Sequence, residues 1–189
     1  MHLVSVILID ALWVVACLFA VDLISGLIHW AEDTWTAPGA SKLFDKWVVL
    51  DNIEHHRRPG AIRAGHYWAT NRVCIALSLF AGGVLMLFHV HAWQAYFIVA
   101  LASQANQVHL WSHSANPPGL VAFLQRFGIL QSPAHHAEHH KRPYASRFCT
   151  MTNYFNPLLD EVRFWRGLEW LIASCGVTVR RATAARGGY

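Results

Sequence analysis

The histidines are the residues of this sequence whose type and spacing could do chemistry. His136, His139 and His140 have i, i+3 and i+4 spacing, which in a helix would place all three imidazoles on one face. His109 and His113 repeat the i, i+4 spacing. Neutral imidazole binds iron, zinc and copper, so each cluster is a candidate set of metal ligands. Further imidazoles lie upstream at His29, His55, His56 and His66.

The number of these histidines indicates more than one metal ion. A catalytic zinc uses three protein ligands and a structural zinc four, so ten histidines are too many for one ion. The chain has neither an HExxH zinc motif nor the Glu-x-x-His pairs of carboxylate-bridged di-iron bundles. We therefore expect a histidine-rich two-metal centre, as in a membrane oxygenase or desaturase. The ten are His29, His55, His56, His66, His109, His113, His135, His136, His139 and His140.

The elements that position these histidines are predicted to be membrane helices. Hydrophobic residues make up 54% of the 189 residues and charged residues only 14%, far from the average soluble protein. Residues 3–28 and 92–110 are apolar runs long enough to cross a hydrocarbon core of about 30 Å, and residues 73–88 form a third apolar run that is short for a span. The fold class expected is an all-α integral membrane protein with about three transmembrane helices. Lys and Arg form no basic face with interleaved aromatic residues, so nucleic acid is not an expected partner.

The basic residues also predict the orientation of the spans. Residues 32–72 are rich in Lys and Arg, and the positive-inside rule places this loop in the cytoplasm. The clustered histidines then lie on the cytoplasmic side of a multi-pass protein, at the inner membrane if the source is a bacterium. His2, His89 and His91 lie on the opposite side. No basic segment precedes the first span, so we expect it to stay as an anchor.

Two later segments are predicted to complete the cytoplasmic face. Residues 120–127 carry leucine and phenylalanine on one face, as an interfacial helix does. Residues 158–172 have a similar pattern, which fits an interfacial helix and a core helix of a histidine-rich cytoplasmic cap equally well. Residues 1–175 would form one membrane-bound domain, followed by a basic tail at residues 176–189.

Several strings in the sequence resemble the lipid desaturase family. They are DLISGLIHWAEDTW (22–35), EHHRRP (54–59), QVHLWSH (107–113) and SPAHHAEHHKRPY (132–144), followed by FCTMTNYFNPLLD and FWRGLE. Their order is consistent from about residue 22 to residue 169, so the resemblance covers most of the chain. The family includes plasmanylethanolamine desaturases and a plastid desaturase that makes a trans-3 bond in a phospholipid.

The resemblance implies a centre of two iron ions that uses dioxygen and two external electrons to remove two hydrogens from a lipid chain. It implies a membrane phospholipid as substrate and a separate electron donor such as cytochrome b5 or ferredoxin. The plant branch of the family lacks the first histidine of this box, so His135 is kept apart from the family's ligands as an additional candidate. The family's ligands correspond to His29, His55, His56, His66, His109, His113, His136, His139 and His140.

Two substrates are open within the resembling family. An alkyl ether phospholipid would be desaturated next to the ether oxygen to a vinyl ether, which converts plasmanylethanolamine to plasmalogen. An acyl chain would be desaturated near its ester carbonyl, in a trans-3 reaction. The intact double-histidine box of residues 135–140 and the upstream pair of residues 55–56 favour the ether lipid.

Three aspartates could orient the metal ligands or join them. A metal-bound imidazole has a second nitrogen that donates a hydrogen bond, and Asp22, Asp33 and Asp160 are the candidate acceptors. A metal transporter is the alternative of a different class, although transport sites usually lie near the bilayer midplane and these histidines lie at span ends. Another histidine-rich membrane oxygenase or a zinc hydrolase also stays open, as does the oligomeric state.

Overall fold

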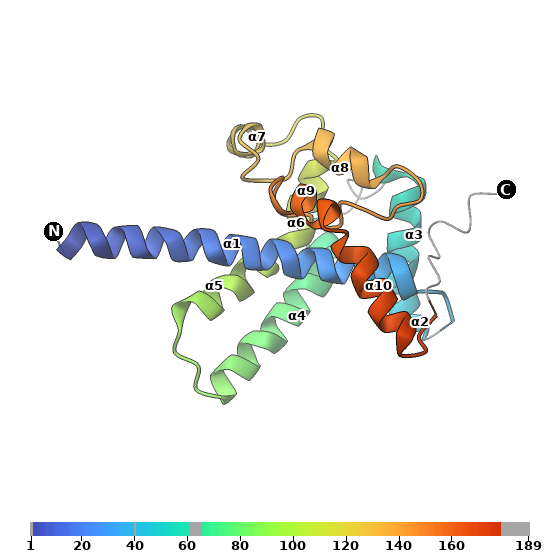
Figure 1. Ribbon diagram of the computed structural model, residues 1–189, viewed down its shortest axis with the longest axis horizontal. Coiled ribbons are helices and arrows are strands. Elements are labelled where there is room, and N and C mark those ends of the chain that lie inside the picture. Colours follow the sequence, from blue (N-terminus) through green and yellow to red (C-terminus); the bar gives the residue numbers. More distant parts are fainter. Residues whose placement is uncertain (1, 40, 61–65, 179–189) are drawn as a thin grey trace.

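The computed structural model describes residues 2–39, 41–60 and 66–178, and within them the chain forms helices and no strands, as expected (Figure 1). Arg180, Arg181 and Arg186 of the predicted basic tail lie outside the described residues. The helices are α1 (His2–Trp35), α2 (Lys42–Phe44), the π-helix η1 (Asp45–Val49), α3 (Leu50–Arg57), α4 (Tyr67–Leu87), α5 (Trp93–Ala102), α6 (Ala105–Ser112), α7 (Gly119–Arg126), α8 (Pro133–His139), α9 (Phe155–Glu161) and α10 (Phe164–Ser174).

Two helices of the described chain, α1 and α4, are long and apolar enough to cross a membrane. In each, only 11% of the most apolar stretch of 18 residues is buried within the protein, whereas a core helix of a soluble protein would be mostly buried. Large apolar side chains such as Leu12 on α1 and Leu79 and Leu87 on α4 are exposed. The first half of α1 projects away from the rest of the chain (Figure 1). These features are those of a membrane protein.

The third predicted crossing is divided into the two short helices α5 and α6. At the break, the Ser103 hydroxyl donates to a carbonyl of the last turn of α5. The amides around the break bond to α4: the Tyr67 hydroxyl donates to Gln104 at 2.9 Å, and Asn106 donates to the Thr70 carbonyl at 2.9 Å. A single α5 is about 15 Å long, so the third crossing stays a prediction.

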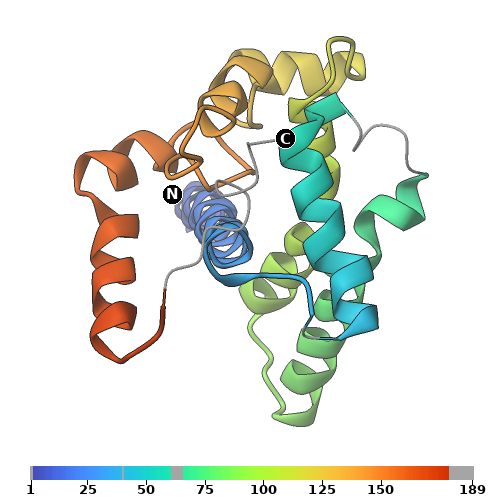
Figure 2. The ribbon, with the colours of Figure 1, turned by 90° about the vertical axis from the view of Figure 1, so that its right-hand side faces the viewer.

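The histidine-bearing helices gather around the C-terminal half of α1. Figure 2 views α1 nearly end-on and shows α3 on one side of it, α10 on the other, and the α7–α8 region across the top. The turn that joins α4 to α5 contains His89 and His91 and lies at the far end of α4. These two histidines are therefore separated from the other clusters by the length of α4, about 30 Å.

The two segments predicted to cover the site differ in outcome. Helix α7 exposes Leu120, Phe123 and Phe127, which supports an interfacial position. The predicted single helix of residues 158–172 is instead the two helices α9 and α10. Arg163 between them adopts a left-handed conformation with φ of 54°, which a continuous helix does not permit.

The main core lies where α1 meets the chain that follows α8. A methyl group at Gly26 of α1 would lie 2.6 Å from the Cys149 sulfur, so only glycine allows this close approach. The buried residues of this cluster are Trp30, Phe148, Cys149, Leu159 and Trp165. Residues 146–152 are therefore packed directly against the helix that carries the first histidine.

Asp22 of α1 holds Met151 and Thr152 in place through hydrogen bonds. Its buried carboxylate accepts the N–H groups of Met151 at 2.9 Å and Thr152 at 3.1 Å, and also the Thr152 hydroxyl. The Ser25 hydroxyl oxygen accepts the N–H of Thr150 at 3.1 Å. The structure gives this carboxylate loop N–H and hydroxyl partners in place of the imidazole expected from the sequence. The carboxylate satisfies backbone N–H groups in a buried loop, and it acts on the site only by holding that loop in place.

Candidate metal centre

Two groups of potential metal ligands lie next to each other between α1, α3, α6 and α8. Within each group, one nitrogen or carboxylate oxygen per residue lies within 4.8 Å of all the others. The rings of His56 and His140, one from each group, have centroids 5.1 Å apart. The five-histidine group consists of His55, His109, His113, His136 and His140, and the mixed group of His29, Asp33, His56 and His139.

Two pairs of consecutive histidines each supply one ligand to each group. His55 belongs to the five-histidine group and His56 to the mixed group, and His140 and His139 are divided in the same way. Consecutive residues of a helix point about 100° apart, so a pair can reach two neighbouring sites from one backbone segment. This division supports two metal positions rather than one.

Helix α8 presents its histidines through a defined start. The Ser132 hydroxyl oxygen accepts the N–H of His135 at 3.3 Å, and Pro133 occupies the first helical position. The i, i+3 pair His136 and His139 then points inward, and both side chains are fully buried. A seven-residue helix is thus enough to deliver ligands to both groups.

In the five-histidine group, Nε2 atoms converge more closely than hydrogen bonds among them explain. Nε2 of His136 lies 2.9 Å from Nε2 of His109 and 3.1 Å from Nε2 of His140, and Nε2 of His113 lies 3.4 Å from that of His109. Both ring nitrogens of His55 are buried without a partner in the described chain. Each neutral ring has one proton at most, so a shared cation satisfies the converging lone pairs best. The group fits a metal ion.

The mixed group brings acceptor atoms together. Nε2 of His29 lies 3.8 Å and Nε2 of His139 lies 3.3 Å from Oδ2 of Asp33. Nδ1 of His29 donates to the Phe148 carbonyl at 3.1 Å, and Nδ1 of His139 to the Ser146 carbonyl at 2.9 Å. Each neutral ring therefore turns the lone pair of Nε2 toward the carboxylate. These three atoms are buried with no hydrogen-bond partner among the described residues, which fits a metal ion between them.

The hydrogen-bond acceptors that orient the imidazoles of the mixed group are only partly those predicted. Asp33 has the expected place, because its Oδ1 lies 2.9 Å from Nε2 of His56 and accepts the side-chain amide of Asn52 at 2.9 Å. The other acceptors are the backbone carbonyls of Ser146 and Phe148. A backbone carbonyl has no residue-type signature, so only the resemblance of the string around it pointed to this loop.

Burial keeps the imidazoles of His55, His136 and His140 in the neutral form that binds metal. The pKa values of His55 and His136 lie well below the usual 6.5, first because of burial and then because of neighbouring imidazoles. The same causes lower the pKa of His140 to about 2. These rings do not need to lose a proton before a metal ion binds at neutral pH.

Besides Asp22, three predicted residues lie outside both groups. His66 is exposed just before α4, so it is not placed to bind metal in this arrangement. Nε2 of His135 accepts the side-chain amide of Asn156 at 3.2 Å. The Asp160 carboxylate pairs with Arg147 at 3.0 Å and accepts no hydrogen bond from an imidazole of the described residues.

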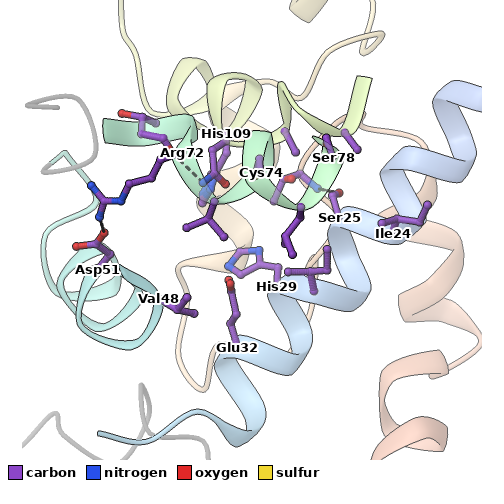
Figure 3. A pocket seen from close by; sticks show the side chains of 18 of the residues that line it. Ile24, Ser25, His29, Glu32, Val48, Asp51, Arg72, Cys74, Ser78 and His109 are labelled. Atoms are coloured by element: carbon purple, nitrogen blue, oxygen red, sulfur yellow. Dashed lines mark hydrogen bonds and ion pairs between the residues drawn. The ribbon is translucent and has the colours of Figure 1, made fainter. Parts of the chain in front are cut away.

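A cavity of about 550 Å³ lies beside both groups, and His29, His55 and His109 form part of its wall (Figure 3). Between α1, α4 and α5 the wall is mostly apolar. Near η1, α3 and the start of α4 it carries charged side chains. The apolar part includes Val21, Ile24, Leu77, Ala81, Ile98 and Val99, and the charged part Glu32, Asp51, Glu54 and Arg72.

Comparison with known proteins identifies relatives for most of the chain. Over 162 residues it is 34% identical to a plasmanylethanolamine desaturase of Myxococcus xanthus, covering 81% of this chain and 57% of that protein. It is 31% identical over 174 residues to plasmanylethanolamine desaturase 1 of Mus musculus, covering 85% and 64%. It is 32% identical over 157 residues to fatty acid desaturase 4-like 1 of Arabidopsis thaliana chloroplasts, covering 78% and 51%. No solved structure matches the chain.

The chain thus spans about half to two-thirds of the length of these relatives. The lipid desaturase domain family matches residues 18–182, which include every residue of both ligand groups. The resemblance seen in the sequence is confirmed. The chain belongs to the lipid desaturase family, whose members are oxidoreductases.

Proposed function

We propose that this chain is an O2-dependent di-iron desaturase that introduces a vinyl ether double bond into an alkyl ether phospholipid. The observation that carries the proposal is the position of both ligand groups along one cavity with a charged part and an apolar part. A phospholipid has the same division between headgroup and chains. Its first chain carbons would lie beside the histidines.

Iron suits the donor atoms of both groups. Imidazole and carboxylate ligands are typical of non-haem iron, and no cysteine belongs to either group in the described chain. Two bound iron ions, with dioxygen, two external electrons and two protons from water, would supply the oxidising power that removes two hydrogens from an unactivated chain and forms two waters. The protein would bind each iron with neutral nitrogens, and Asp33 would add one negative charge to the mixed group.

The residues of the chain itself would bind and orient the lipid. The apolar wall between α1, α4 and α5 would hold the alkyl chain and keep water away from the reacting carbons. His29, His55 and His109 would border the part of the chain that is oxidised. The buried, unpartnered nitrogens of His29 and His55 would bind the metal ions, which would place the reacting carbons at this wall.

The ether lipid is supported by two relatives named plasmanylethanolamine desaturases and by the histidine pairs at residues 55–56, 135–136 and 139–140. The second candidate is an acyl lipid desaturated near its ester carbonyl in a trans-3 reaction. Similarity to a chloroplast fatty acid desaturase 4-like protein favours it. Both reactions take place close to the headgroup.

The test is expression in cells that lack vinyl ether lipids and are fed an alkylglycerol. We expect lipid mass spectrometry to find acid-labile plasmalogen, absent from cells that express His139→Ala. A trans-3 acyl phospholipid without plasmalogen would make the acyl lipid the substrate. No new double bond in any lipid, with well-expressed protein, would contradict the desaturase proposal.

The proposal includes a multi-pass protein with its metal centre on the cytoplasmic side and a separate electron donor such as cytochrome b5 or ferredoxin. Cysteines introduced by His66→Cys and His91→Cys, in a chain with Cys175→Ser, test the topology through membrane-impermeant labelling. We expect the two positions to react from opposite sides of the membrane. Labelling of both from the same side would contradict the orientation.

A further inference from the structure

The charged part of the cavity contains a compact arrangement around Arg72, in the second turn of α4. Its guanidinium pairs with the Asp51 carboxylate at 3.0 Å and lies 5.4 Å from the ring centroid of Trp47 (Figure 3 shows the pair). All three residues line the cavity. The side chain of Asp51 is 63% exposed and that of Arg72 34%, so this part of the cavity reaches the surface.

The Arg72 guanidinium has a hydrogen-bond donor that no described residue uses. Its Nε is buried and has no hydrogen-bond partner among the described residues, while one of its terminal nitrogens bonds to Asp51. Arginine offers five N–H donors in a planar fork that matches a phosphate group. A buried donor without an acceptor beside a cavity indicates that a ligand supplies the acceptor.

The position of Arg72 relative to the histidines fits a phospholipid. Along α4 the cavity extends from Ala69 to Ala81, about 18 Å, and along α1 from Glu32 to Val21, about 16 Å. His29 lies near the charged end of the α1 wall. A headgroup held at Arg72 would therefore place the first carbons of the chain at the histidines and the rest in the apolar part.

We propose that Arg72 and Asp51 form the headgroup site of this enzyme, an inference that rests on the proposed function. The phosphate of a zwitterionic phospholipid binds the Arg72 guanidinium and displaces the Asp51 carboxylate from it. The ammonium group of the same lipid then pairs with Asp51. One intramolecular ion pair is exchanged for two pairs with the lipid. Arg72 and Asp51 are positioning residues, since neither belongs to a metal-ligand group.

The exchange predicts selectivity for a headgroup with both charges. A lipid with a phosphate but no ammonium would satisfy Arg72 and leave the Asp51 carboxylate beside the phosphate, two like charges at one site. A lipid without a phosphate would leave the original ion pair intact and gain neither contact. Trp47 would cover the guanidinium in both states.

The test measures equilibrium binding of tritium-labelled short-chain lipids to the purified, iron-loaded protein in detergent. The probes are an alkyl-acyl glycerophosphoethanolamine and the matching alkyl-acyl glycerol without a headgroup. We expect Arg72→Gln to weaken binding of the first by about 10-fold to 100-fold and of the second by less than about 2-fold. Lys46→Gln is the matched control, because it removes a positive charge from η1 at a side chain that does not line the cavity.

A third probe, the same lipid with phosphomethanol in place of phosphoethanolamine, tests Asp51. Asp51→Asn should weaken binding of the ethanolamine lipid and leave the phosphomethanol lipid unchanged or more tightly bound. Inorganic phosphate is added as a competitor and should displace the lipid only weakly, since it has no chain to fill the apolar wall. Binding of inorganic phosphate as tight as that of the lipid would overturn a lipid site.

Equal weakening of both lipids by Arg72→Gln would mean that Arg72 only supports the structure, and would also overturn the proposal. The binding assay does not depend on turnover. A wild-type protein that desaturates no lipid would therefore contradict the proposed function, while the phosphate-dependent effect of Arg72→Gln would still decide the headgroup site.

Discussion

The five-histidine group and the mixed group lie side by side but differ in charge and in the hydrogen bonds that orient their ligands. The five-histidine group offers only neutral nitrogens, and His113 and His140 are partly exposed. The mixed group offers three nitrogens and one carboxylate, all buried. In the mixed group, backbone carbonyls and Asn52 bond to the ligands. In the five-histidine group, Nδ1 of His136 and His140 has no hydrogen-bond partner among the described residues.

This difference predicts unequal metal positions. A carboxylate offsets part of the charge of a bound cation, and hydrogen bonds to the other ring nitrogens fix the ligand geometry before binding. We therefore expect the mixed group to hold its metal more tightly and the five-histidine group to lose its metal first. One ligand set is preformed, and the other depends more on the metal itself.

The largest expected effect comes from removing one ligand of either group. His139→Ala in the mixed group and His113→Ala in the five-histidine group should each lower desaturation more than about 100-fold, because both metals are needed and small displacements are costly. Metal analysis should show one iron lost per chain in each variant. Retention of both irons by either variant would break the assignment of that group.

His91→Ala is the control for these variants. It replaces a histidine in the turn between α4 and α5, at the far end of α4 from the ligand groups. Activity and metal content should match the wild type. Loss of activity in well-expressed His91→Ala would contradict the separation of the two sets of histidines.

The next effect concerns the single carboxylate. Asp33→Asn keeps the size of the side chain but removes the charge, and should weaken the tighter metal by about 10-fold to 100-fold. Titration with a chelator measures the two affinities. Asp160→Asn makes the same chemical change outside both groups and should leave them unaltered. Equal affinities in the wild type would remove the basis of the comparison.

A smaller effect is expected from pH in the metal-free protein. The folded-state pKa values of His55 and His136 are lowered below 6.5, so below pH 6.5 the unfolded chain binds protons that the folded chain does not. Each of these two imidazoles should reduce the free energy of unfolding by about 1.4 kcal/mol per pH unit as pH falls below 6.5, and should have no effect above pH 6.5. Thermal unfolding in detergent measures this. His136→Gln should give a shallower dependence, and a flat profile from pH 5 to 7.5 would contradict the burial of neutral imidazoles.

The smallest effect is expected at His66, where the family resemblance and the structure disagree about a ligand. His66 matches a family ligand by resemblance, yet its side chain is exposed and belongs to neither group. His66→Ala should keep both irons and most of the activity. Loss of one iron would show that residues before α4 close over the metal centre.

The ligand set was largely predictable because spacing is a local property. The i, i+4 pair of His109 and His113 and the i, i+3, i+4 set of α8 need only a helix to share a face, and eight of the nine histidines expected as ligands are brought together. The all-helical class followed from long apolar runs. Which consecutive histidine serves which group could not be read from spacing, since it depends on how α3 and α8 pack.

The remaining features depend on contacts between distant residues. The break between α5 and α6 is stabilised by Tyr67 of another helix, and Asp22 bonds to a loop that lies 129 residues further along the chain. The Arg72–Asp51 pair joins residues 21 positions apart across the cavity. Hydrogen bonds of this kind leave no periodic pattern in the sequence.

Metal analysis of the active protein purified with its lipid is the most direct test of a two-iron centre. We expect two irons per chain, and mild chelation should remove the iron of the five-histidine group before that of the mixed group. A preparation that retains activity with one zinc per chain and no iron would contradict it.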